Sequence, residues 1–296
     1  MKERRVVITG MGLVTPLGND LDGTWDAVMH SRSGVGPITR FDPSRMGCHI
    51  AAEVKGFDAS NVLDAREVRR YDRFMHFAMA ATAEAIERSG LVFDDGLREV
   101  TGVIYGSGMG GLSTILDAEA SLRERGASRV TPFLAPGSAI NMAAGIISMR
   151  WRLYGPNYAT VSACSTSAHA IADGYHAIQR GDADVMVTGG SEAVLSEVTM
   201  ASFDNMGALS RRNDEPERAS RPFDRDRDGF VLGEGAATLV LEELSHALHR
   251  GATPVAEIIG VGMAADAYHL TAPAPDGAGA ARGMRRALAA SGLRPE

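Results

Sequence analysis

Apolar residues along the chain follow two patterns, short continuous runs typical of buried strands and longer stretches with helical spacing. Several of the short runs end in glycine, for example residues 184–190, where a turn is expected. The expected strands are residues 4–12, 101–105, 157–161, 184–190, 230–242 and 254–262, and the expected helices are residues 22–31, 61–89, 112–125, 165–179 and 277–291.

The order of these elements predicts an α/β fold. A strand, a helix and a second strand surround residue 164, and such a βαβ unit predicts a parallel or mixed sheet with helices packed on it. Residues 254–262 echo the glycine-containing strand near the N-terminus, which suggests a second, related half beginning near Gly251. We therefore predict two units, residues 1–250 and residues 251–296. The long polar stretch of residues 210–228 is predicted to be a functional loop or a lid.

The most informative residue of the predicted βαβ unit is Cys164. It lies where the strand gives way to the helix, and the free N–H groups and the dipole of a helix N-terminus favour a thiolate. Small residues on both sides, such as Ala163 and Ser165, let a substrate approach closely. These features indicate a nucleophile, and the alternative is a small buried hydrophobic residue, which is what most free cysteines are.

Composition restricts the class of protein. The chain has 296 residues, 45% of them hydrophobic, which suits one large globular domain or two smaller ones. A net charge of −7 argues against electrostatic binding of nucleic acid by the protein as a whole. Cys48 and Cys164 cannot form a disulfide framework, and the sequence shows no signal segment and no long apolar run. We expect a cytoplasmic protein that does not bind membranes.

Two motifs suggest ligands but lack part of the corresponding fingerprint. Gly106, Gly108 and Gly111 form G-x-G-x-x-G between an expected strand and helix, but no second strand ending in an acidic residue follows about twenty positions later. Residues 224–229 resemble the start of a calcium-binding EF-hand loop, yet Gly235 stands where that loop needs a glutamate. We expect no nucleotide cofactor and no metal, and we expect the acidic residues of the loop to pair with its arginines.

A cluster of arginines begins the predicted helix of residues 61–89. Arg66, Arg69, Arg70 and Arg73 have the spacing i, i+3, i+4 and i+7, so they are expected to share one helix face. The cluster is either a solvated face, as charge runs usually are, or a docking surface for an acidic partner.

Five motifs occur together along the chain. In this order they resemble the β-ketoacyl-[acyl-carrier-protein] synthases of type II, condensing enzymes of the thiolase-like superfamily. The motifs are G-M-G-L-V-T-P-L-G at 10–18, G-S-G-M-G-G at 106–111, V-S-A-C-S-T-S at 161–167, G-D-A-D-V-M-V-T-G-G-S-E-A at 181–193, and the long run that starts A-L-S-R-R-N-D at 208 and ends G-E-G-A at 236.

The resemblance implies a layered αβαβα thiolase-like fold, usually assembled as a homodimer, that needs no cofactor. Cys164 would accept an acyl group from acyl carrier protein as a thioester. Malonyl-carrier protein would then be decarboxylated, and the resulting carbanion would attack the thioester and extend the chain by two carbons. The Cys164 N–H would be one oxyanion donor.

The resemblance also assigns roles to other residues. Met109, Leu134 and Phe203 match positions that line the acyl pocket, with Leu134 reaching across from the dimer partner, although each could equally be ordinary core. The basic docking patch for the carrier protein corresponds to Arg66, Arg69 and Arg70. Gly207 stands where the family often has arginine, which removes one expected contact.

The C-terminal third that supplies the family's catalytic histidines, a lysine and a second oxyanion donor has no counterpart here. His169 and His176 lie on the predicted Cys164 helix and are expected to be packing or surface residues, while His269 matches a non-catalytic position near the active site. We hypothesise that the sequence lacks this third, and we expect no condensation by the 296-residue chain alone. The alternatives are a ketosynthase of a polyketide pathway, a non-catalytic partner subunit, which typically lacks the cysteine, and a carrier-binding scaffold.

Overall fold

The computed structural model describes residues 4–295, which form strands and helices in alternation. The strands are β1 (Val6–Val14), β2 (Gly36–Pro37), β3 (Ile50–Ala51), β4 (Thr101–Gly106), β5 (Asn157–Tyr158), β6 (Val185–Glu192), β7 (Gly235–Glu243) and β8 (Ala256–Ile258). The helices are α1 (Leu21–Met29), α2 (Ala65–Arg70), α3 (Arg73–Ser89), α4 (Asp95–Glu99), α5 (Leu112–Arg125), α6 (Leu134–Ser138), α7 (Met142–Trp151), α8 (Thr166–Arg180), α9 (Glu197–Asn205), α10 (Leu244–His249) and α11 (Ala278–Ser291).

One six-stranded sheet carries the fold, with the strand order β5-β4-β6-β7-β1-β8. β4 is parallel to both β5 and β6, whereas β7 is antiparallel to β6 and β1, and β8 is antiparallel to β1. The sheet is therefore mixed, and the predicted α/β class is confirmed. β2 and β3 form a separate small hairpin-like pair.

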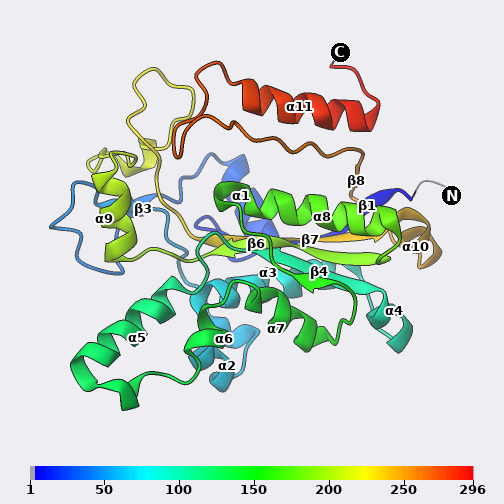
Figure 1. The fold of residues 1–296 in the computed structure, drawn as a ribbon, viewed down its shortest axis with the longest axis horizontal. Helices are drawn as coiled ribbons and strands as arrows, with labels where there is room; N and C mark the ends of the chain where they lie inside the picture. The colour runs from blue at the N-terminus through cyan, green and yellow to red at the C-terminus, as the bar shows by residue number, and fades with distance from the viewer. Residues whose placement is uncertain (1–3, 296) are drawn as a thin grey trace.

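Helices cover both faces of this sheet, and further layers lie above it (Figure 1). α3 and α7 pack on one face, where Phe74, Phe77 and Tyr105 are fully buried. α8 packs on the other face, over a core that includes Ile178 and Met186. Above α8, Figure 1 shows an extended segment that leads from β8 toward α11, and α11 forms the outermost layer.

The predicted helix of residues 61–89 is wrong as a single element, because two helices separated by extended residues occur there. α2 ends at Arg70, and Tyr71 adopts an extended conformation (φ −96°, ψ 140°). Asp72 then caps α3 by accepting a hydrogen bond from Phe74 N, and its other carboxylate oxygen accepts bonds from Thr114 N and Oγ1. The side chain of Asp72 thus starts a new helix instead of allowing the first one to continue.

Three predicted strands are shorter in the structure than in the sequence pattern. β5 covers only Asn157–Tyr158, because the backbone then turns toward α8. β7 starts at Gly235, five residues after the apolar run begins, and β8 covers three residues of the run 254–262. Residues 210–228 form a loop as expected, with a single 3-10 turn at Pro216–Arg218.

Candidate active site

Cys164 lies in a one-turn 3-10 helix, Ala163–Ser165, directly before α8. The preceding residue, Ala163, has a φ of 50°, a left-handed conformation that costs a non-glycine residue about 1–2 kcal/mol. Hydrogen bonds hold the turn in this form: Ser162 N donates to Thr166 Oγ1 at 2.8 Å, and Thr160 Oγ1 donates to the Thr166 carbonyl at 2.9 Å. The result is a sharp turn that presents Cys164 as an exposed free thiol.

Two glycines allow this turn to lie directly on the sheet. A Cβ at Gly106, the last residue of β4, would overlap Thr166 Cγ2, and a Cβ at Gly190 in β6 would overlap Ser167 Oγ. Because β4 and β6 are parallel, both glycines lie toward the carboxyl ends of their strands. Cys164 is therefore held at the edge of the sheet where ligands commonly bind in α/β folds.

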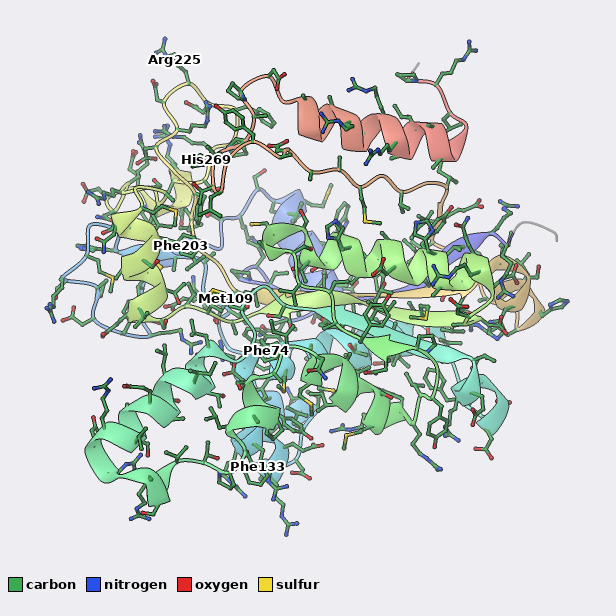
Figure 2. All side chains as sticks on the ribbon, in the orientation of Figure 1. Phe74, Met109, Phe133, Phe203, Arg225 and His269 are labelled. Atoms are coloured by element: carbon green, nitrogen blue, oxygen red, sulfur yellow. The ribbon has the colours of Figure 1, made fainter. Side chains whose placement is uncertain are left out.

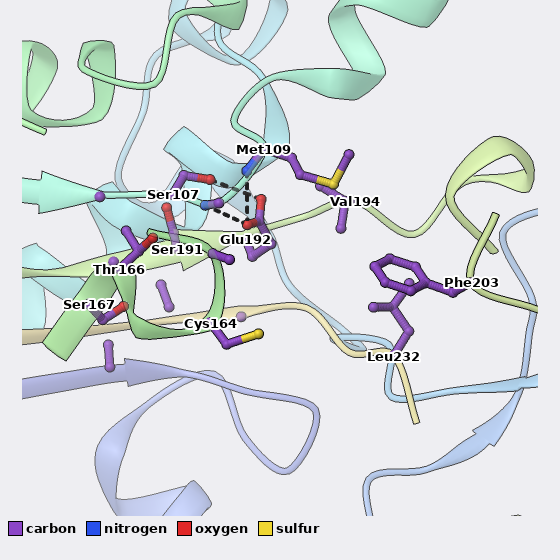
Figure 3. Close-up of a pocket in the computed structure, with 17 residues that line it drawn as sticks. Ser107, Met109, Cys164, Thr166, Ser167, Ser191, Glu192, Val194, Phe203 and Leu232 are labelled. Atoms are coloured by element: carbon purple, nitrogen blue, oxygen red, sulfur yellow. Dashed lines mark hydrogen bonds between the residues drawn. The ribbon is translucent and has the colours of Figure 1, made fainter. Parts of the chain in front are cut away.

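A pocket of about 470 Å³ opens beside the thiol. Figure 3 shows the Cys164 sulfur directed toward Phe203 and Leu232, with Met109 and Val194 on the opposite wall. Most of the lining residues are apolar or small, which suits an alkyl chain. They are Gly106, Ser107, Gly108, Met109, Ala163, Cys164, Thr166, Ser167, Gly190, Ser191, Glu192, Val194, Phe203, Leu232, Gly235, Ala236 and Ala237.

The structure brings together three of the four residues that we predicted for the acyl pocket and nucleophile. Cys164, Met109 and Phe203 all line it, and Phe203 is held by an edge-to-face contact with Phe230, with ring centroids 5.5 Å apart. Leu134 does not line it, since it begins α6, which lies beside α7 on the opposite face of the sheet from α8 (Figure 1). In Figure 2, Met109 and Phe203 lie at one end of the sheet, whereas Phe133, next to Leu134, lies at the base of the molecule.

The glycine-rich loop after β4 binds a carboxylate of the protein itself. Glu192 Oε2 accepts hydrogen bonds from the N–H groups of Gly108 (2.7 Å) and Met109 (3.2 Å), and Oε1 accepts one from Ser107 Oγ (2.9 Å; Figure 3). Burial raises the pKa of Glu192 above its ordinary value, although these hydrogen bonds oppose the rise. A nucleotide phosphate has no place here, because the amides that would bind it already bind Glu192.

The histidines singled out in the sequence, His169, His176 and His269, do not line the Cys164 pocket. His169 Nδ1 lies 2.5 Å from Ser162 Oγ, and the ring of His176 packs edge-to-face against Tyr175. His269 is exposed, and its Nδ1 accepts hydrogen bonds from Thr271 N and Ala272 N. Within residues 4–295, the lining of the Cys164 pocket contains no histidine and no lysine.

The arginine cluster is divided between two helices, so the prediction that all four share one face is wrong. Arg66, Arg69 and Arg70 are exposed on α2. Arg73 belongs to α3 and points into the protein, where its Nη2 lies 2.9 Å from Oε1 of the buried Glu234. Arg73 is therefore a structural ion-pair partner and not part of the surface patch.

The acidic residues of the 210–228 loop mostly bind the loop itself. Asp228 accepts hydrogen bonds from Ser210 Oγ and Arg211 N, and Asp226 forms an ion pair with Arg225. Arg211 instead pairs with Asp204 of α9, a residue outside the predicted set. In the part of the chain that the structure describes, no group of three or more acidic, histidine or cysteine side chains could hold a metal ion.

Sequence reasoning did not single out Glu192, Val194 or Leu232, although Glu192 and Leu232 lie inside quoted motifs and Val194 directly follows one. For Glu192, the available signal was an acidic residue just after the buried run that ends in Gly189-Gly190, because a polar group at the end of a parallel strand usually has a function.

None of the helices among residues 4–295 is long and apolar enough to cross a membrane.

Sequence and structure comparisons give consistent results. Residues 3–247 match the beta-ketoacyl synthase N-terminal domain, and residues 255–296 match the beta-ketoacyl synthase C-terminal domain. The 3-oxoacyl-[acyl-carrier-protein] synthase 2 of Synechocystis sp. (strain ATCC 27184 / PCC 6803 / Kazusa) is 47% identical over 296 residues, which cover all of this chain and 71% of that protein.

Solved structures resemble the chain over nearly its whole length. A beta-ketoacyl synthase from Burkholderia phymatum STM815 superposes with a TM-score of 0.88 and 37% identity, covering 98% of this chain and 71% of that one. A ketosynthase bound to a hexaketide, in complex with a type II polyketide synthase acyl-carrier protein, has a TM-score of 0.82 and 26% identity, covering 99% and 71%. These neighbours confirm the thiolase-like fold, and the chain belongs to the beta-ketoacyl synthase family.

Proposed function

We propose that this chain is an acyltransferase that condenses acyl groups delivered by acyl carrier protein, as a 3-oxoacyl synthase of fatty acid elongation. The observation that carries the proposal is the exposed Cys164 thiol at the mouth of a 470 Å³ apolar pocket. The 47% identity to a 3-oxoacyl-[acyl-carrier-protein] synthase 2 over the whole chain supports the same activity.

In the first step, the Cys164 sulfur attacks the thioester carbonyl of an acyl group on the carrier protein. The bond from the carbonyl carbon to the carrier sulfur breaks, and the thiol proton of Cys164 is transferred to the departing carrier thiolate. No side chain caps the N-terminus of α8, and the N–H groups of Ser165 and Thr166 donate to carbonyls within the turn, so we assign the Cys164 N–H as one donor to the oxyanion. The alkyl chain enters the pocket between Met109 and Phe203.

In the second step, malonyl-carrier protein loses CO₂, and the resulting carbanion attacks the carbonyl carbon of the Cys164 thioester. A carbon–carbon bond forms, the bond from that carbon to the Cys164 sulfur breaks, and the cysteine leaves as a thiolate while the extended acyl chain stays on the carrier protein. This step needs groups that stabilise the developing enolate, and in residues 4–295 no histidine or lysine lines the pocket. We therefore expect the 296-residue chain alone to accept an acyl group but not to release CO₂ from malonyl-carrier protein.

Acyl carrier protein is expected to dock on α2, whose exposed Arg66, Arg69 and Arg70 suit an acidic partner. Arg69 and Arg70 also line a depression of about 260 Å³ that includes Arg125 and Arg129. Arg70 is held in place by stacking on Phe133, with its guanidinium carbon 4.3 Å from the ring centroid.

A homodimer is the expected assembly, and β5 is the surface that favours it. Asn157 and Tyr158 form an edge strand with both residues exposed, and Tyr154 and Val161 are exposed beside it. An open edge with apolar neighbours is suited to pairing with a second copy. Leu134 would then contribute to the partner's pocket.

Two free thiols are consistent with a location in the cytoplasm.

A polyketide ketosynthase is the second candidate, because the hexaketide-bound ketosynthase shares the fold. A non-catalytic partner subunit is disfavoured by the exposed Cys164. The two catalytic candidates differ in the acyl chain that the pocket accepts, so the profile of accepted acyl groups separates them.

Intact-protein mass spectrometry after incubation with palmitoyl-carrier protein tests the proposal. We expect one palmitoyl group on the wild-type chain and on Cys48→Ala, which removes the buried cysteine, and none on Cys164→Ala. Replacing Arg66, Arg69 and Arg70 by Glu should slow acylation without slowing alkylation of Cys164 by iodoacetamide. An unmodified wild-type chain whose Cys164 still reacts with iodoacetamide would overturn the proposal.

A further inference from the structure

Glu192 has a role that acyl transfer does not explain. Its carboxylate ends β6 and is half-buried at the pocket wall, and among residues 4–295 it forms no ion pair. Its charge is compensated by the hydroxyl of Ser107 and the N–H groups of Gly108 and Met109 (Figure 3). A partly buried carboxylate without a cation is costly unless several donors are directed at it.

The loop is built closely around this carboxylate. A Cβ at Gly108 would lie 2.7 Å from Glu192 Oε2, so any larger residue at position 108 would displace the carboxylate. Ser107 Oγ extends the arrangement by accepting a hydrogen bond from Gly110 N at 3.0 Å while it donates to Glu192. Glu192 therefore organises, directly or through Ser107, the backbone N–H groups of three consecutive residues, 108–110.

The same turn places Met109 in the pocket. Met109 is 45% exposed, and its side chain lies toward Val194 and Phe203 in Figure 3. A flexible thioether with this exposure receives little support from packing, so its backbone position decides how far it extends into the pocket. Without Glu192 the N–H groups of residues 108 and 109 lose their acceptor, and the turn would rearrange toward water to satisfy them.

We propose that Glu192 is a positioning residue that fixes the 107–110 turn and, through Met109, determines the length of alkyl chain that the Cys164 pocket accepts. The acyl nature of that chain rests on the proposed function, whereas the geometric effect does not. Gln at position 192 keeps a carbonyl oxygen for the two backbone N–H groups and can donate to Ser107, so it should preserve the turn. Leu at this position has a similar size but no acceptor.

Labelling of Cys164 with alkyl methanethiosulfonates of two, eight and twelve carbons tests this inference. The thiolate attacks the alkyl-bearing sulfur, a new S–S bond forms and methanesulfinate leaves, so no enzyme activity is required. The readout is the labelling rate of the octyl reagent divided by that of the ethyl reagent, corrected with Cys164→Ala. We expect Glu192→Leu to change this ratio about tenfold, the equivalent of losing one satisfied hydrogen-bonded anchor, and Glu192→Gln to keep it within about twofold.

Glu53 provides a matched control, because it also accepts two backbone N–H groups and one hydroxyl, from Thr39 N, Arg40 N and Thr39 Oγ1, away from the pocket. Glu53→Leu should leave the ratio unchanged. If Glu192→Leu does not fold by circular dichroism, Ser107→Ala, which removes one anchor, should shift the ratio in the same direction. An unchanged ratio in a folded Glu192→Leu or in Ser107→Ala overturns the inference. Failure of palmitoyl-carrier protein to acylate the wild type would overturn only the proposed function.

Discussion

Two strand–helix pairs, one near each end of the chain, are built on the same local contact. In β1, Gly10 and Gly12 lie against carbonyl oxygens one helical turn apart in α3, those of Ala85 and Ala81. In the extended segment after β8, Gly260 and Gly262 lie against carbonyl oxygens of α11 with the same four-residue spacing. The second pair of carbonyls belongs to Ala287 and Gly283. In both pairs the first glycine contacts the later carbonyl, so helix and strand run in opposite directions.

The surroundings of the two pairs differ completely. α3 is buried along most of its length against the sheet and beside α7, whereas Gly279 is the one buried residue of α11 in the described chain. The comparison teaches that a Gly-x-Gly strand is sufficient to set how a helix approaches it. Stability depends on what else the helix buries. The correspondence also supports the proposal that a second, related unit begins near Gly251.

The largest effect is expected from Gly12→Ala. The added Cβ would overlap the Ala81 carbonyl and lie 2.8 Å from Ala85 N, both of them backbone atoms of a buried helix. We expect the free energy of unfolding to fall by about 3 kcal/mol, at the upper end of overpacking effects, in urea denaturation followed by circular dichroism. Gly145→Ala in α7 is the control, since its nearest neighbour lies 3.9 Å away, and it should not destabilise. Equal stability of Gly12→Ala and wild type would refute this view of β1.

A smaller effect on stability is expected from neutralising a carboxylate beside one of the two strands. Glu242 contacts β1, and Glu257 belongs to β8. The buried Glu242 accepts hydrogen bonds from Arg250, His246 and Thr9, whereas Glu257 of β8 pairs with Arg5 at the surface. Burial alone would raise the pKa of Glu242, but the bonds from Arg250 and Thr9 outweigh it and the pKa lies below the ordinary 4.5. We expect Glu242→Gln to cost about 2 kcal/mol at pH 7 in urea denaturation, and Glu257→Gln to have no measurable effect.

The pH dependence follows from the direction of that shift. Because the folded-state pKa of Glu242 is the lower one, its contribution is fully present above the ordinary value of 4.5 and is lost as the pH falls through the folded-state pKa. The difference between wild type and Glu242→Gln should therefore shrink in acid. A difference that stays constant between pH 7 and pH 3 would contradict the assignment.

The smallest effect on global stability is expected from Gly262→Ala. Its Cβ would overlap the Gly283 carbonyl and lie only 2.4 Å from Ala287 N. Both are backbone atoms of α11, so the helix has to move. Since α11 buries little, we expect the unfolding free energy to change by less than about 0.5 kcal/mol. Hydrogen exchange of the α11 amides should accelerate about tenfold, the sign of local opening. A global loss as large as that of Gly12→Ala would show that the two regions unfold as one.

Strongly periodic segments could be predicted from the sequence alone. α5 and α11 lie within a residue of their expected bounds, because long amphipathic patterns with glycine at their ends leave few alternatives. The break between α2 and α3 was missed in the sequence, because the side chain of Asp72 that caps α3 is also held by Thr114, which is distant in sequence. The same distance explains why Arg73 was placed on the wrong surface: its partner Glu234 is 161 residues away.

The site was predictable at Cys164 and only partly elsewhere. A cysteine directly before a helix is a local signal, and Met109 and Phe203 followed from motifs that match a known family; the structure places all three at one pocket, and their roles stay predictions. The ligand of the G-x-G-x-x-G loop could not be predicted from the local sequence. Whether such a loop binds a phosphate or a side chain depends on which group the fold brings to it. Here β6 runs parallel to β4 and ends in Glu192, whose carboxylate accepts hydrogen bonds from the N–H groups of the loop.

The left-handed backbone of Ala163 has a consequence for protein engineering. A stability-guided redesign would replace Ala163 by Gly, the residue that adopts a φ of 50° without strain, and could gain about 1 kcal/mol. The same substitution would widen the conformational freedom of the residue that precedes Cys164, our proposed nucleophile, so the thiol would spend less time at the pocket mouth. Thermostability and reactivity are thus in opposition at one position, and a screen for melting temperature alone would select against the activity.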